Sequence, residues 1–556
     1  MYRLKKKFTI ILTLFLGLLV SCHNLDDLNI NPNGVDPAIA DINFLMPTVQ
    51  TNIGQRVFDI GFGTCSGIMQ HTQQTGWFSG YNNYEWTTLS HSWNGYYNIL
   101  MNNEEYFYKS VQQNNEFHEG VARIMRAYVF GMITDLWGDA PYKDALKAEQ
   151  GSAYFMPAFD PQQEIYHGIL ADLDTANLLL SKPAGEYSNI VVKQDVIYGG
   201  NVSKWQKFAN SLALRYYMRL QAKEPDFAEA GIRKIAGNPA QYPVINVADD
   251  DANIGFPGTS AGVSNPLNFT FDARPADGAY MRVKMGKTLV DVLRENKDPR
   301  LGVWANKIEI PLRLVSGTGI DRIVDIGNDR QVREVSQDLV TAFEANGMKV
   351  DFDPEYAGVT ISHPLVQIFN MNNANAAQGV VNPHASHLNT RYTETTDPLV
   401  LMRLISAAET NLILAEAAHR GWISGTPEQY YDAGVRESFR AWGLGAEFGN
   451  YINDNPYDGL SSIIEQKWIA HWTTAHEAWF DWRRTGLPDL KTGPSAARSV
   501  LPLRWYYHTS DEIEKNPVHA GAAIERLEAT SYQGTDQTKN SAWSKMWLLQ
   551  NTGKPW

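Results

Sequence analysis

The clearest hydrophobic pattern along the chain lies between residues 462 and 484, which read SIIEQKWIAHWTTAHEAWFDWRR. Ser462 and Glu465 have the spacing of a helix-capping box, and Gly486 and Pro488 follow as stop signals. The pattern predicts one long helix that buries its tryptophans, rather than a row of rings open to sugars. The stripe recurs at steps of three or four residues, as on one face of an α-helix, and consists of Ile464, Trp468, Trp472, Ala475, Trp479 and Trp482.

Helical periodicity also appears in four other segments, and it makes the predicted fold class mostly α. In one of them Leu404, Ala408, Leu412 and Ala415 form the apolar stripe. Neighbouring helices joined by short turns are similar to tetratricopeptide pairs. Residues 222–400 are rich in Gly, Asn, Asp and Pro, which indicates long irregular loops with a few short strands and helices. The four segments are 121–137, 204–221, 402–420 and 427–442.

The N-terminal residues follow a different pattern, with a basic start, an apolar run from Phe8 to Val20, and then Cys22. The run is shorter than the ~20 apolar residues that span a bilayer, and it is typical of an export signal. Leu19 to Cys22 resembles a bacterial lipobox; an ordinary export signal that happens to hold a cysteine is the alternative. We therefore expect a signal peptide over 1–21, a lipid on Cys22, a tether over 22–42, and a single domain over 43–556.

Composition adds two constraints on function. The net charge is −13, which disfavours a nucleic-acid partner because little would displace counterions from phosphates. Cys22 and Cys65 are the two cysteines of the sequence, so a lipidated Cys22 leaves no pair for a disulfide. The aromatic content is unusually high, with 16 Trp, 26 Tyr and 22 Phe, and more rings than a core requires would suggest that some stack on a ligand at the surface.

The sequence contains the start of several catalytic and metal-binding motifs, but each lacks a residue or a structural context that the motif requires. His476 and Glu477 start a zinc motif, but Phe480 stands where the second histidine belongs. Cys65 has the spacing of a nucleophile elbow without the strand–turn–helix context that such a motif needs. Pro32 replaces the glycine that a calcium loop starting at Asp27 requires. We expect no enzyme activity and no cofactor, with a structural calcium ion left open; the acidic turn 249–251 could hold such a cation.

Several stretches together resemble the SusD-like/RagB family of surface lipoproteins from Bacteroidetes. They occur in the family's order over nearly the whole mature chain. Two departures are His508, where members usually have proline, and a C-terminal tail that lacks the usual Trp-Trp-Asp signature. The matching stretches are DLNINPNG after the lipobox, TDLWGDAPY at 134–142, DPRL at 298–301, ILAEAAHRGW at 413–422, EAWFDWRRTGLPDL at 477–490 and LPLRWYY at 501–507.

The resemblance implies a mostly helical, SusD-like fold with tetratricopeptide-like pairs, and a binding protein rather than an enzyme. It implies lipid attachment through Cys22 to the outer membrane, facing the cell exterior. Asp26 and Asp27 resemble the acidic signal that sends such lipoproteins there. It also implies a partner, a SusC-like TonB-dependent transporter that imports a captured oligosaccharide. The alternatives are a peptide ligand on the same fold and an anchored glycoside hydrolase.

The ligand-binding residues are expected in the segment TGWFSGYNNYEW at 75–86. Its rings are crowded among Gly and Asn, which indicate turns, and they show no helical stripe. Trp93 begins a helical pattern and is expected to pack in the core. A second candidate surface is the Gly/Ser/Asn-rich loop 256–276. The expected ligand contacts are Trp77, Phe78, Tyr81, Asn83, Tyr84 and Trp86.

Overall fold

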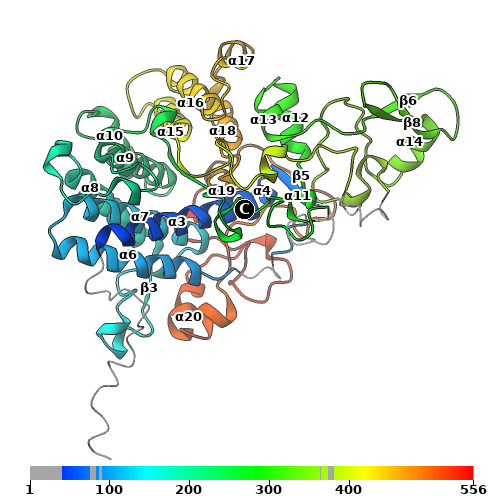
Figure 1. The fold of residues 1–556 in the computed structure, drawn as a ribbon. Helices are drawn as coiled ribbons and strands as arrows, with labels where there is room; N and C mark the ends of the chain where they lie inside the picture. The colour runs from blue at the N-terminus through cyan, green and yellow to red at the C-terminus, as the bar shows by residue number, and fades with distance from the viewer. Residues whose placement is uncertain are drawn as a thin grey trace, which may run out of the picture.

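The computed structural model describes residues 41–74, 83–86, 91–276, 278–363, 365–373 and 381–554. The protein is mostly helical, as predicted, with packed helices on one side and irregular chain with short strands on the other (Figure 1). Within these residues, no helix is both long and apolar enough to cross a membrane. The predicted signal peptide, Cys22 and the predicted tether up to residue 40 lie outside them, and the first described helix begins at Ile42, the last residue of that tether.

The first group of helices packs in consecutive pairs, as tetratricopeptide-like pairing predicts. α7 lies between α6 and α8, α8 packs on α9, and α9 packs on α10, while α3 packs on α6. Asn115 caps α7, because its side chain accepts a hydrogen bond from His118 N at 3.2 Å. The group comprises α3 (Ile42–Phe58), α6 (Asn94–Gln112), α7 (Glu116–Trp137), α8 (Gln162–Leu179), α9 (Val202–Arg219) and α10 (Pro225–Gly237).

A second group of helices covers the C-terminal third of the chain. α15 packs on both α16 and α18. Thr426 and Gln429 form a capping box at the start of α16, which lies where the sequence predicts a helix over 427–442. The group comprises α15 (Ala407–His419), α16 (Pro427–Ala441), α17 (Phe448–Asp454), α18 (Gly459–Ala470), α19 (Ala475–Thr485) and α20 (Pro517–Glu525).

The predicted single helix over 462–484 is wrong, because the chain breaks there into α18 and α19. His471 ends α18, and its Nδ1 lies 2.9 Å from the Thr474 hydroxyl within the break. Ser462 lies inside α18, where its hydroxyl donates to Gly459 O, so it does not cap the helix. The tryptophans of the stripe are buried as predicted. Gly486 ends α19 at φ +77°, a left-handed conformation that glycine adopts without strain.

The predicted helix over 402–420 is correct only from residue 407. Leu404 belongs to the strand β9 (Leu401–Ile405), which pairs antiparallel with β4 (Ala252–Gly255). A short continuous apolar run fits a buried strand as well as a helix, and the partner strand that decides between them lies about 150 residues away in sequence. Ser406 then caps α15 by accepting from Glu409 N at 3.2 Å.

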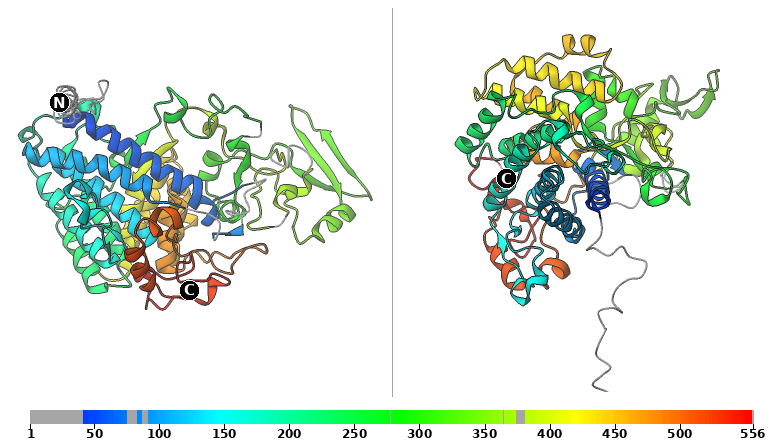
Figure 2. Two further views of the ribbon diagram at one scale, coloured as in Figure 1. Left: turned by 90° about the horizontal axis from the view of Figure 1, so that it is seen from below. Right: turned by 60° about the vertical axis from the view of Figure 1, so that its left-hand side comes forward.

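The strands form small separate sheets. β1 (Thr72–Gln74) pairs antiparallel with β5 (Val283–Met285), with Thr72 opposite Met285, and β2 (Ala140–Pro141) pairs with β3 (Phe159–Asp160). β6 (Leu312–Val315), β8 (Gln331–Ser336) and β7 (Asp321–Asp325) form a three-stranded sheet in that order. This sheet and α14 (Gln337–Glu344) project from the body (Figure 2). Short helices lie nearby: α4 (Ser66–Ile68), α11 (Ala279–Arg282), α12 (Lys287–Glu295) and α13 (Arg300–Trp304).

The stretches that carry the family resemblance meet in the core as buried ion pairs. Glu416 of α15 accepts two hydrogen bonds from the Arg484 guanidinium of α19, at 2.7 and 2.5 Å. Asp135 at the end of α7 meets α19, because Arg483 donates to the Asp135 backbone O at 2.7 Å and lies 3.6 Å from its carboxylate. These residues hold separate helices together. The motifs therefore identify the scaffold and do not mark a ligand site.

Candidate ligand-binding cavity

The loop 256–276 closes one side of a cavity of about 710 Å³, which we call the loop cavity. The other walls come from the end of α3, the π-helical turn Asp59–Cys65, strand β1 and helix α11. β1 ends at Gln74, which lines the cavity, and the next residues, 75–82, lie outside the described part of the chain. The lining includes Phe58, Asp59, Phe62, Gly63, Thr72, Gln74, Leu267, Asn268, Phe271, Asp272, Arg274, Gly278 and Arg282.

Two phenylalanines one helical turn apart form the floor of the loop cavity. The rings of Phe58 and Phe62 lie 5.2 Å apart. Phe62 stacks on Tyr392 behind it, with ring centres 5.2 Å apart and planes at 9°. Phe58 meets Phe256 edge to face at 5.1 Å. Phe58 and Phe62 are 2% and 5% exposed, so the floor is apolar and rigid, and the accessible ring of the cavity is Phe271 on the loop.

The loop wall combines an exposed ring with an ordered backbone. Phe271 is 43% exposed, and its backbone N–H donates to Asn268 Oδ1 at 2.9 Å. Asn265 ties the loop to the body, because its Nδ2 donates to Tyr392 O at 2.7 Å. Phe269 N donates to Thr393 O at 2.9 Å. The loop therefore presents Phe271 from a fixed position.

Charged groups lie around the same hollow. Burial raises the pKa of the Asp59 carboxyl, although Arg56 opposes that shift. The Asp272 carboxylate packs directly against the backbone of Gly278: a Cβ added to Gly278 would lie 1.7 Å from Asp272 Oδ2. The cavity thus offers carboxylate oxygens beside aromatic rings, and Arg274 and Arg282 line it as well. Such a site can pack against the apolar faces of a ligand and form hydrogen bonds with its hydroxyl groups.

The predicted ring segment is described only in part. Trp77, Phe78 and Tyr81 lie outside the described residues, so their role stays a prediction. Asn83 is half-buried, and its backbone carbonyl accepts from Ala497 N at 2.7 Å.

Tyr84 and Trp86 are core residues, which corrects the expectation that their rings are exposed. Tyr84 is 0% and Trp86 is 1% exposed. Gln70 Nε2 donates to the Tyr84 hydroxyl at 3.1 Å, and Trp86 packs edge to face on Trp479 at 5.5 Å. Their rings fill the interior beneath the segment. Neither offers a free face to a ligand.

Sequence reasoning did not single out the rings that line the loop cavity. Phe271 lies inside the candidate loop 256–276, but no sequence feature identifies it as a ligand contact. Phe58 and Phe62 have the spacing of apolar residues in a helix. Only the spacing of four between Phe58 and Phe62 indicates that they share a face. Nothing local in the sequence places that face opposite a loop 200 residues away.

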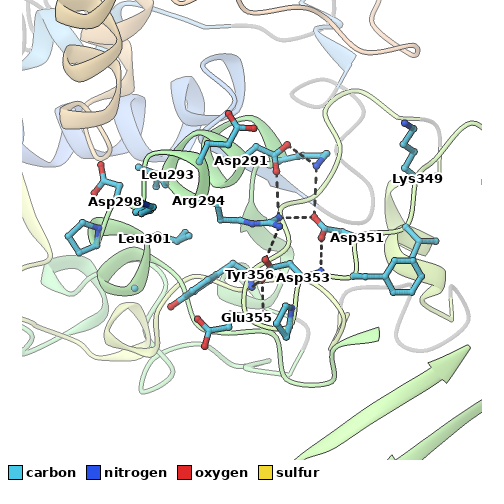
Figure 3. A pocket seen from close by; sticks show the side chains of 18 of the residues that line it. Asp291, Leu293, Arg294, Asp298, Leu301, Lys349, Asp351, Asp353, Glu355 and Tyr356 are labelled. Atoms are coloured by element: carbon cyan, nitrogen blue, oxygen red, sulfur yellow. Dashed lines mark hydrogen bonds and ion pairs between the residues drawn. The ribbon is translucent and has the colours of Figure 1, made fainter. Parts of the chain in front are cut away.

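A second large hollow of about 920 Å³ lies between α12, α13 and the segment 349–356 (Figure 3). Arg294 stands at its centre and pairs with Asp351 at 3.1 Å and Asp353 at 2.8 Å. Lys287 pairs with Asp291 at 2.7 Å. These charges are bonded to one another. The loop cavity, with its aromatic floor and an exposed ring, is therefore the stronger ligand-binding candidate.

The remaining chemical candidates have structural roles. Cys65 is fully buried, and desolvation raises the pKa of its thiol, which disfavours the thiolate. In the acidic turn, Asp250 pairs with Lys207 at 2.6 Å and Asp251 accepts from Ala407 N at 2.7 Å. Across the described residues, no group of three His, Cys, Asp or Glu side chains is arranged to hold a metal ion.

Solved structures of other proteins share this fold. A protein named as chitin-binding is 24% identical, with a TM-score of 0.68, and the match covers 93% of this chain and all of the other. A SusD homologue from Bacteroides fragilis is 22% identical, with a TM-score of 0.66, over 92% and 100% of the two chains. A chitin-binding SusD homologue from Flavobacterium johnsoniae is 21% identical, with a TM-score of 0.66, over 92% and 99%.

No protein of curated function matches the chain. The SusD-like family model, whose description is "Starch-binding associating with outer membrane", matches residues 36–350 and 355–508. These ranges include the helical scaffold, the loop cavity and most of the motifs that form the buried ion pairs. The chain therefore belongs to the SusD-like family of proteins that associate with the outer membrane.

Proposed function

We propose that this protein is a lipid-anchored receptor that captures oligosaccharides in the loop cavity and delivers them to a SusC-like TonB-dependent transporter. SusD-like proteins are binding proteins and not enzymes, so the cavity is expected to hold its ligand unchanged. Cys22 would carry the lipid that keeps the protein on the outer face of the membrane.

The observation that carries this proposal is the exposed ring of Phe271 above an apolar floor, with carboxylate and amide groups in the same hollow. The C–H faces of a sugar ring pack on aromatic rings, and its hydroxyl groups bond to Asn, Gln and Asp. Trp77, Phe78 and Tyr81, which follow the lining residue Gln74 in the sequence, are proposed as further contacts.

Chitin oligosaccharides are the first ligands to test, because two structural relatives are named as chitin-binding. Purified protein without its signal peptide would be titrated by calorimetry with oligomers of N-acetylglucosamine, with malto-oligosaccharides and with a panel of peptides. We expect saturable binding of one glycan class and none of the peptides. Peptide binding without glycan binding would favour the alternative ligand, and binding of neither would contradict the proposal.

A further inference from the structure

A smaller hollow of about 200 Å³ lies away from the loop cavity, where α6 begins, beside β2, β3 and the turn before α20. We call it the ring pocket. In Figure 1 its neighbours β3 and α20 lie below the helical scaffold. Four aromatic side chains line it: Trp93, Tyr97, Phe155 and Phe159.

Three of these rings hold one another in place. The Trp93 ring lies 5.0 Å from Phe159 and 5.5 Å from Tyr97, edge to face in both pairs. The Tyr97 hydroxyl donates to Pro141 O at 2.6 Å, which fixes that ring on β2. The inner wall of the ring pocket is therefore preformed, and a ligand would not have to order it.

The fourth ring is unusually exposed. Phe155 is 66% exposed, although it lines the pocket, and the neighbouring Met156 is also exposed. Phe155 directly follows a single 3-10 turn, Ser152–Tyr154. Covering such a ring with a ligand would remove apolar surface from water, which is favourable. The outer wall of the pocket therefore has apolar surface available for contact.

The polar groups of the ring pocket include one buried acceptor that has no partner among the described residues. Asn516 Nδ2 donates to Pro157 O at 2.7 Å, while its buried Oδ1 has no hydrogen-bond partner in the part of the chain that the structure describes. An unpaired buried acceptor is costly, and a ligand that donates to it would recover that cost. Asp511, which also lines the pocket, accepts from Lys515 Nζ at 3.0 Å, and Lys515 and Asn94 line the pocket beside it.

We propose that the ring pocket binds one sugar ring, so that the protein holds a glycan at two separate places. This rests on the proposed function, which makes the ligand a saccharide. An aliphatic side chain would match the aromatic walls but would leave Asn516 Oδ1 unpaired, whereas sugar hydroxyl groups can donate to it. The volume is below the roughly 300–1,000 Å³ of a site for a whole small molecule and suits a single ring.

The test is a titration monitored by NMR with glucose, galactose, mannose, xylose and N-acetylglucosamine at millimolar concentration, on the wild type and four variants. Phe155→Ala and Asn516→Leu alter the ring pocket, and Phe271→Ala alters the loop cavity. Phe44→Ala is the matched control, because Phe44 is a similarly exposed phenylalanine on α3 that lines neither site.

We expect two classes of site in the wild type and in Phe44→Ala. Phe155→Ala and Asn516→Leu should each weaken binding at the ring pocket at least tenfold and leave binding at the loop cavity unchanged. Phe271→Ala should weaken binding at the loop cavity and leave the ring pocket unchanged. A single class that is lost in Phe271→Ala and unchanged in both ring-pocket variants would overturn the ring pocket and leave the proposed function standing. Absence of any saccharide binding would overturn both.

Discussion

Aromatic residues that look alike in the sequence have opposite roles in the structure. Trp86 and Phe271 both follow polar, turn-rich sequence, yet Trp86 is buried and Phe271 is 43% exposed. Trp86 is buried because Trp479, nearly 400 residues later, packs against it. Local composition indicates a turn-rich segment with aromatic rings. Which of these rings faces the interior depends on residues far away in the sequence, and local composition says nothing about them.

The candidate site was therefore only partly predictable from the sequence. The loop 256–276, predicted as a second candidate surface because Gly and Asn indicate turns that carry exposed side chains, lines the loop cavity, while the predicted contacts Trp77, Phe78 and Tyr81 stay a prediction. Phe58 and Phe62 could not be recognised, because a helix with apolar residues at steps of four is typical of a core. Tyr84 and Trp86 were assigned to the ligand wrongly for the same lack of long-range information.

The two parts of the segment 75–86 should respond differently to the same substitution. Trp77→Ala or Tyr81→Ala is expected to lower glycan affinity by about 1–3 kcal/mol, as lost stacking contacts do, and to leave stability unchanged. Trp86→Ala is expected to lower the free energy of unfolding by about 3–5 kcal/mol, because it opens a cavity in the core. Calorimetric titration and urea denaturation measure the two effects.

Unchanged affinity together with an unchanged melting temperature in Trp77→Ala and Tyr81→Ala would remove both rings from the site. Trp86→Ala with wild-type stability would contradict its place in the core.

Among the elements, strongly periodic helices were predictable and short strands were not. The segments 121–137, 204–221 and 427–442 overlap α7, α9 and α16, because apolar residues recur in each at helical spacing over several turns. The break between α18 and α19 was missed because the tryptophan stripe continues across it. β9 was read as helix because five apolar-rich residues fit both structures.

The pair of Glu416 and Arg484 joins α15 to α19, and both side chains are buried. Glu416→Gln is expected to lower the free energy of unfolding by about 1.5–3 kcal/mol, since it removes one of the two buried carboxylates that pair with the Arg484 guanidinium and leaves Asp481 as the other. Glu528, whose side chain is 42% exposed beside Lys545, is the matched control, and Glu528→Gln should cost less than about 1 kcal/mol. Urea denaturation of both variants tests this, and equal losses would contradict it.

Buried titratable groups are expected to make the whole molecule less stable in acid. Burial lowers the pKa of His71 and of His476 to about 3. Although burial opposes it, neighbouring arginines hold the pKa values of Glu416 and Glu477 at about 2. As the pH falls, these histidines and glutamates take up protons in the unfolded chain before they do so in the folded protein, below about pH 6.5 for histidine and about 4.5 for glutamate. Proton binding therefore favours the unfolded chain, and the free energy of unfolding falls as the pH falls.

The melting temperature should thus be lower at pH 4.5 than at pH 7, with a smaller drop in His71→Leu. Asp251, whose pKa burial raises to about 7, acts in the opposite direction and reduces the net effect. Differential scanning calorimetry measures the drop. A melting temperature that stays constant or rises toward pH 4.5 would show that these groups do not control stability.

At the scale of the cell, the anchor is expected to depend on Cys22. Cys22→Ala should move the protein from the membrane fraction to the soluble fraction, because the lipid would have no attachment point. Cys65→Ala is the control, since Cys65 is buried in the folded domain and should leave the protein on the membrane. Cell fractionation followed by immunoblotting distinguishes the two; a Cys22→Ala protein that still sediments with membranes would contradict the anchor.

The central claim is that the loop cavity holds a glycan on aromatic rings. The most direct measurement is the Kd for chitin oligosaccharides, or for whichever glycan binds, in wild type, Phe271→Ala and Phe269→Ala. Phe269 is similarly exposed on the same loop but lies against Tyr280 and does not line the cavity. We predict a loss of affinity of about 1–3 kcal/mol for Phe271→Ala and none for Phe269→Ala. Equal affinities in all three proteins would contradict the claim.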